Sequence, residues 1–97
     1  MDFKINAVHF TADKDLVTFV KDKVNKLENM YDHIIAGEVF LRVENNGGKE
    51  NKKVEIRISI PGNDLFASKQ GQSFEEATDL TVSALKKQVE KHKPKHV

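Results

Sequence analysis

The strictest pattern in the sequence is an alternation between residues 54 and 60. Every second residue there is a valine or an isoleucine, and the residues between them are Glu55, Arg57 and Ser59. Successive side chains of a β-strand point to opposite faces of its sheet, so this segment predicts a strand with one apolar and one polar face. A sheet with one face in water must bury its other face against a second layer.

Three further segments repeat this period of two, at residues 3–8, 38–44 and 65–69. The last of them is predicted to be the shortest strand. Asn-Asn-Gly-Gly at 45–48 and Pro-Gly-Asn-Asp at 61–64 predict tight turns, which make the last three strands an antiparallel meander. Residues 32–37 are predicted to turn the chain into that meander.

Two segments carry apolar residues at spacings of three and four, which is typical of amphipathic helices. Asp13 is predicted to cap the first helix, which runs for about four to five turns to Tyr31. Ser73 and Glu76 have the spacing of a capping box at the start of the second helix. The apolar stripe of that helix is predicted to contain Phe74, Ala77, Thr78, Thr81, Val82, Leu85 and Val89.

The order of elements is therefore βαβββα. A helix between the first two strands implies a parallel pair with a right-handed crossover. Each helix has a single apolar stripe, so both helices must pack on the same face of the sheet. The predicted fold is an α+β two-layer sandwich, in which a four-stranded mixed sheet (first pair parallel, the rest antiparallel) has two helices packed on one face. A single domain is predicted for residues 1–93, followed by a flexible tail at residues 94–97.

The composition excludes several classes of function. The chain has no cysteine, which excludes disulfides and thiolate metal sites. No apolar run is long enough to span a membrane, and the N-terminus lacks a signal-peptide pattern, so we expect a cytoplasmic protein. The four histidines are scattered and the serines lack the context of a nucleophile. The sequence therefore predicts no catalytic residue, no metal, no cofactor and no small-molecule substrate.

Positive charge gathers at the C-terminal end of the chain, although the net charge is only +1. Glu75, Glu76 and Asp79 open the second helix, and only Glu90 opposes the bases that follow, which are Lys86, Lys87, Lys91, Lys93 and Lys95 with His92 and His96. One interpretation is a phosphate-binding surface, which Lys21 and Lys26 of the first helix would share. The other is a solvated helix end whose lysines complement the helix dipole.

Two aromatic residues fall at strand positions that face the open side of the predicted sheet. Phe40 and Phe66 could stack on nucleic-acid bases there or support self-association. They could equally be covering residues of a thin sheet, or the register could differ by one residue.

Several segments resemble the ribosome hibernation promoting factor / ribosome-associated inhibitor (Y protein) family in its short form. They are residues 19–28 (Phe-Val-Lys-Asp-Lys-Val-Asn-Lys-Leu-Glu), residues 31–34 (Tyr-Asp-His-Ile) and the positions Gly71, Gln72, Ala77, Asp79, Leu85, Gln88, Lys91, His92 and Lys93. The resemblance extends over essentially the whole chain. The sequence differs from the family at Glu75, where many members have tyrosine, and at Ala84, where a lysine is usual.

The resemblance implies a non-catalytic factor of stress or stationary phase. Such proteins bind the small ribosomal subunit and its 16S rRNA in the mRNA/tRNA channel, and so inactivate whole ribosomes. By position, the family's basic residues correspond to Lys86, Lys87, Lys91 and Lys93 on the second helix and to Lys23 and Lys26 on the first. Lys21, His92 and Lys95 are additional candidate RNA contacts.

Two alternatives remain beside this interpretation. A generic module for structured RNA would bind a plain RNA duplex as tightly as a ribosome. A protein-interaction module that modulates an alternative sigma factor would instead use the sheet around Phe40 and Phe66, and would tolerate substitution of the helical lysines.

Overall fold

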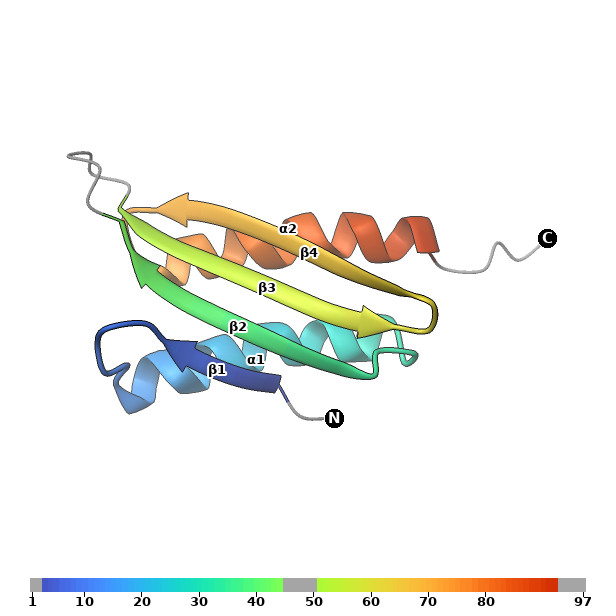
Figure 1. Cartoon of the computed structure of the whole chain (residues 1–97), viewed down its shortest axis with the longest axis horizontal. Helices are drawn as coiled ribbons and strands as arrows, with labels where there is room; N and C mark the ends of the chain where they lie inside the picture. Colours follow the sequence, from blue (N-terminus) through green and yellow to red (C-terminus); the bar gives the residue numbers. More distant parts are fainter. Residues whose placement is uncertain (1–2, 45–50, 93–97) are drawn as a thin grey trace.

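The computed structural model of the chain describes residues 3–44 and 51–92. Its elements follow the predicted order: β1 (Phe3–Ala7), α1 (Lys14–Met30), β2 (Ala36–Val43), β3 (Lys52–Ile60), β4 (Asn63–Gly71) and α2 (Phe74–His92). The strands form one sheet in the order β1-β2-β3-β4, with β1 parallel to β2 and the other pairs antiparallel (Figure 1). The predicted mixed sheet is confirmed.

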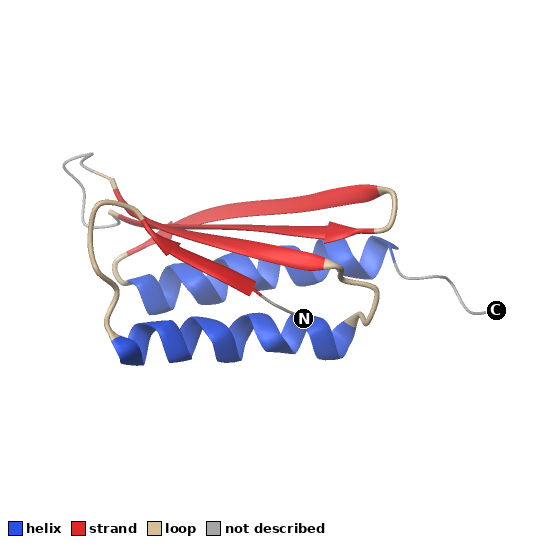
Figure 2. Ribbon diagram, turned by 60° about the horizontal axis from the view of Figure 1, so that its bottom comes forward, coloured by secondary structure: helices blue, strands red, loops and turns tan. Residues whose placement is uncertain are grey.

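Both helices lie on the same face of this sheet, as predicted (Figure 2). They pack side by side and run in the same direction, because each follows a strand that points the other way (Figure 1). α2 lies mainly against β3 and β4. Within residues 3–44 and 51–92 the other face of the sheet carries no helix, so this part of the chain forms a two-layer sandwich with one open sheet face.

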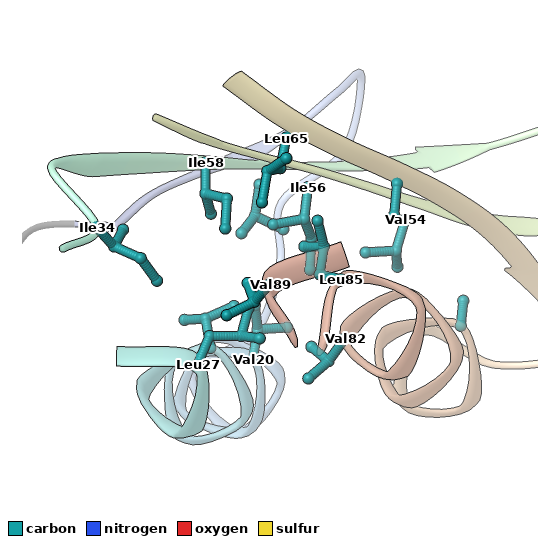
Figure 3. Close-up of a cluster of buried hydrophobic side chains, with 14 of the residues drawn as sticks. Val20, Leu27, Ile34, Val54, Ile56, Ile58, Leu65, Val82, Leu85 and Val89 are labelled. Atoms are coloured by element: carbon teal, nitrogen blue, oxygen red, sulfur yellow. The ribbon is translucent and has the colours of Figure 1, made fainter. Parts of the chain in front are cut away.

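The core lies between the two layers. The apolar side of the sheet and the apolar stripes of both helices meet there, and Val54, Ile56 and Ile58 of β3 are fully buried. Figure 3 shows how the layers interlock, with Ile56 and Ile58 of the sheet above Val20 and Leu27 of α1 and Val82, Leu85 and Val89 of α2. The two periodicities in the sequence therefore identified the core-facing side of each element.

The start of β2 differs from the prediction. Residues 32–37 were expected to form a turn, but β2 begins at Ala36 and Gly37 pairs with Phe3 of β1. The Phe3 ring lies directly over Gly37, and a Cβ atom on that glycine would come within 2.1 Å of a ring carbon. Gly37 is thus a strand residue at which the Phe3 ring takes the space that a side chain would need.

β4 is also longer than predicted. It extends from Asn63 to Gly71, because the turn between β3 and β4 needs only Pro61 and Gly62 and Ile60 already pairs with Asn63. Gly62 has a φ of 79°, which glycine adopts without steric cost. β4 therefore runs alongside all of β3, while the predicted hairpin turn at 45–48 and tail at 94–97 lie outside the described residues.

Both helices begin as predicted. The backbone N–H of Leu16 donates to Asp13 Oδ1 at 2.8 Å, which caps α1. At α2, the N–H of Glu76 donates to Ser73 Oγ at 3.0 Å and the Glu76 carboxylate accepts from the N–H of Gln72 at 3.0 Å. These bonds satisfy backbone donors that have no partner within their helices.

Replacing Asp13 with alanine is expected to lower the free energy of unfolding by about 1 kcal/mol, because an N-cap acceptor is lost. Asp13→Asn keeps an oxygen acceptor at the same place and is expected to retain most of that stability. Urea denaturation followed by circular dichroism measures both. Equal losses in the two variants would show that the cap hydrogen bond does not stabilise α1.

Candidate nucleic-acid interface

α2 carries opposite charges at its two ends. Glu75, Glu76 and Asp79 are exposed in its first half, whereas Lys87 and Lys91 are exposed and Lys86 is half-buried in its second half. The acidic first turn complements the helix dipole. The surface formed by α1 and α2 is therefore basic only toward the C-terminal end of α2, and not along its whole length.

Lys86, Lys87 and Lys91 carry the positive charge in this half of α2. Lys87 and Lys91 are one turn apart and lie on the same side of α2. Lys86 follows Asp79 by nearly two full turns, so it lies on the same side of α2 as Asp79. Within the described ranges, no carboxylate lies within ion-pair distance of any of these three lysines. Their ammonium groups are thus available to an external anion.

Lys23 of α1 differs from these three lysines because its ammonium group has an ion-pair partner. Its Nζ lies 2.9 Å from Oδ1 of Asp79 and 5.3 Å from the centre of the Phe19 ring. The Lys23 side chain therefore points from α1 toward α2, where it is paired with an acid of that helix. Among the predicted RNA-binding lysines that the structure describes, Lys23 is the one with an ion-pair partner.

The two other lysines predicted on α1 point in different directions. Lys26 is exposed and lies three residues after Lys23, about 60° from it around the helix, so it is on the same side of α1 as Lys23. Lys21 is exposed too, but it lies two positions before Lys23, which places it about 200° around α1 and away from α2. The structure therefore groups Lys26 with Lys86, Lys87 and Lys91, and separates Lys21 from them.

The remaining predicted contacts are at the end of the chain. His92 is the last residue of α2, and Lys93 and Lys95 lie outside the described residues. The described basic surface consists of Lys26, Lys86, Lys87 and Lys91, and this set is called the basic end below.

The open face of the sheet holds both predicted aromatic residues. Phe40 of β2 is half-buried and Phe66 of β4 is 50% exposed, so the register is the one that the alternation predicted. Arg42 lies over the Phe40 ring, 5.6 Å from its centre. Arg57 pairs in register with Phe66, and these residues line one shallow, open depression.

Among the described residues, three ion pairs lie on this face. Arg42 binds Glu55, Arg57 Nη2 lies 3.0 Å from Asp64 Oδ2, and Lys53 Nζ lies 3.4 Å from Glu44 Oε1. The hydrogen bond from Arg57 lowers the pKa of the Asp64 carboxyl. Sequence reasoning missed these pairs, since the strand register that brings them together is not visible in a single segment. The open face is thus close to electrically neutral, unlike the basic end.

Over residues 3–44 and 51–92, no three His, Asp or Glu side chains are grouped so that they could hold a metal ion. Neither described helix is long and apolar enough to cross a membrane.

The sequence profile of a protein family described as "Sigma 54 modulation protein / S30EA ribosomal protein" matches residues 3–97. The chain belongs to this family. A curated S30EA relative, the ribosome hibernation promoting factor of Pseudomonas putida, is 30% identical over 95 residues, which cover 98% of this chain and 89% of the relative. The family resemblance seen in the sequence is confirmed.

Solved structures share the fold of this S30EA family chain. A ribosomal subunit interface protein from Coxiella burnetii superposes with a TM-score of 0.85 at 19% identity, over 98% of this chain and 100% of that one. The N-terminal domain of Thermus thermophilus Protein Y gives a TM-score of 0.78 at 20% identity, over 93% of this chain and 96% of that one. At these identities the likeness concerns the fold alone, and it agrees with the predicted two-layer sandwich.

Proposed function

We propose that the chain is a ribosome hibernation factor that binds the small ribosomal subunit through its basic end. Membership of a family whose curated relatives are named ribosome hibernation promoting factors supports the ribosome as the partner. The observation that carries the choice of surface is the group of lysines on α2 and α1 that have no carboxylate partner among residues 3–44 and 51–92. Such a factor would act in the cytoplasm, where ribosomes are.

We propose that the protein inactivates the ribosome by occupying the mRNA/tRNA channel and not by catalysing a reaction. Lysine ammonium groups bind phosphates mostly without reading the base sequence, so the basic end would bind the 16S rRNA backbone. The position of the domain in the mRNA/tRNA channel would then keep messenger and transfer RNA out, which inactivates whole ribosomes during stress or stationary phase. The shape of the folded RNA, and not base readout, would supply the specificity.

Co-sedimentation with purified small ribosomal subunits at graded salt tests this proposal. The chain is expected to pellet with small subunits at low salt and to be released as salt rises. If all four lysines of the basic end neutralise phosphates, the slope of log K against log salt is about −3. Large subunits and a plain RNA duplex serve as comparisons in the same assay.

Two outcomes would contradict the proposal. Failure to pellet at any salt concentration would exclude ribosome binding. Binding to the plain duplex as tight as binding to small subunits would make the chain a generic module for structured RNA.

A second candidate function is protein interaction through the open sheet face. The half-exposed Phe66 ring and the neutral, ion-paired surroundings favour an uncharged protein surface over RNA phosphates. Modulation of an alternative sigma factor would be one form of this candidate function. The candidate requires that Phe40→Ser and Phe66→Ser remove function while ribosome binding persists, whereas the proposed function requires that function and ribosome binding both survive these substitutions.

A further inference from the structure

The ion pair between Lys23 and Asp79 joins the two helices beside the basic end. Its N to O distance is 2.9 Å, and the side chains are 27% and 54% exposed. Solvent and dissolved anions can therefore reach both charged groups. The pair belongs to the same helical surface as Lys26 and Lys86 but differs from them, because here a carboxylate of the chain already occupies the ammonium group.

A paired lysine contributes little to the binding of a polyanion. The energy of a lysine-phosphate contact in water comes largely from the counterions that the contact releases. An ion pair within the protein is neutral, so a phosphate that approaches Lys23 would have to displace the Asp79 carboxylate and would be repelled by it. The Phe19 ring beneath the ammonium group adds a second reason for Lys23 to stay where it is.

We propose that the Asp79 carboxylate competes with RNA phosphate for the ammonium group of Lys23. The carboxylate takes the place that a phosphate oxygen would otherwise take, and it thereby sets the number of lysines that bind RNA. This inference rests on the proposed function and deepens it. The basic end binds the ribosome with Lys26, Lys86, Lys87 and Lys91, and Lys23 is added only when the ion pair opens.

The test uses the whole chain in the small-subunit assay at graded salt. Asp79→Asn keeps the shape of the side chain and removes its charge. One additional phosphate contact steepens the slope of log K against log salt by about 0.7 to 0.9, and it tightens binding by up to about fivefold to eightfold at 0.1 M salt. Asp79→Asn is expected to show both effects.

Asp22→Asn is the matched control. Asp22 is exposed on α1, one residue before Lys23 and one turn before Lys26, and no cation of the described residues lies within ion-pair distance of it. The control makes the same change in net charge without releasing Lys23. It is expected to change affinity by less than about twofold and to leave the slope unchanged. Equal gains in the two variants would overturn the proposal, because net charge alone would then explain them.

A double-variant cycle with Lys23→Gln completes the experiment. Lys23→Gln alone leaves the Asp79 carboxylate unpaired beside the basic end and is expected to weaken ribosome affinity slightly without steepening the slope. In combination with Asp79→Asn it should remove the gain and return affinity to the native value. A gain that persists without Lys23, or weaker binding by Asp79→Asn, would overturn the proposal. Thermal unfolding of each variant verifies that the fold is retained. Failure of the native chain to bind in a salt-dependent way would instead refute the proposed function, so the two failures are distinguishable.

Discussion

Replacing Lys86, Lys87 and Lys91 with glutamate is expected to abolish binding to the small ribosomal subunit. These lysines have no carboxylate partner in the described part of the chain, so each can release a counterion when it meets a phosphate. Three lost contacts correspond to a loss of at least about 100- to 500-fold in affinity at 0.1 M salt, before the repulsion of the new carboxylates is added. Co-sedimentation at graded salt measures the loss.

A control with the same change in net charge separates this surface from overall charge. Lys4, Lys14 and Lys69 are exposed on β1, at the start of α1 and on β4, away from the basic end. Glutamate at these three positions is expected to weaken binding far less. A triple variant with glutamine at 86, 87 and 91 avoids acidic residues near the helix C-terminus and is expected to bind weakly as well. Native-like binding by the glutamate variant at 86, 87 and 91 would refute the basic end as the contact surface.

Replacing Leu85 with alanine is expected to cost about 2 to 5 kcal/mol of unfolding free energy. Leu85 is fully buried and points from α2 toward Ile56 of the sheet (Figure 3). The substitution leaves a cavity between two layers that are each held by their neighbours and cannot collapse freely. For a domain of this size the loss corresponds to a decrease in Tm of roughly 10 to 25 °C, which thermal unfolding followed by circular dichroism measures.

Leu80 supplies the control for this prediction on the same helix. It is 45% exposed, so Leu80→Ala removes the same atoms from a site that is already half in water. Its expected effect on the free energy of unfolding is within about 0.5 kcal/mol. Similar losses for the two substitutions would mean that α2 does not pack on the sheet through Leu85.

These two predictions concern different properties of one helix turn. Leu85 holds α2 on the sheet, and the next two residues, Lys86 and Lys87, carry the charges that we propose for RNA binding. The lysine variants are expected to lose binding while they keep most of their stability, since exposed lysines make few stabilising contacts. The Leu85 variant is expected to lose stability first and binding only as it unfolds.

Most of the fold could be predicted because its signals are local. The alternation from Val54 to Ile60 identified the buried side of the central strand, and Asp13 and Ser73 identified the starts of the helices. The two differences in strand bounds described above depend on residues of neighbouring strands. Gly37 is a strand residue because Phe3 covers it, and β4 is long because it pairs with all of β3. Residues so far apart in the chain give no joint signal in a single sequence.

The amino-acid sequence by itself determined the class of each element, the core-facing sides and the gathering of lysines at the end of α2. Periodicity and capping depend on residues that are close together in the chain, so they can be predicted without knowledge of the rest of the molecule. Only the tertiary structure decided which lysines are available. The packing of α1 against α2 pairs Lys23 with Asp79, turns Lys21 away and leaves Lys26 as part of the basic end. The same holds for Arg42 and Arg57, because the strand register decides which carboxylate each one meets.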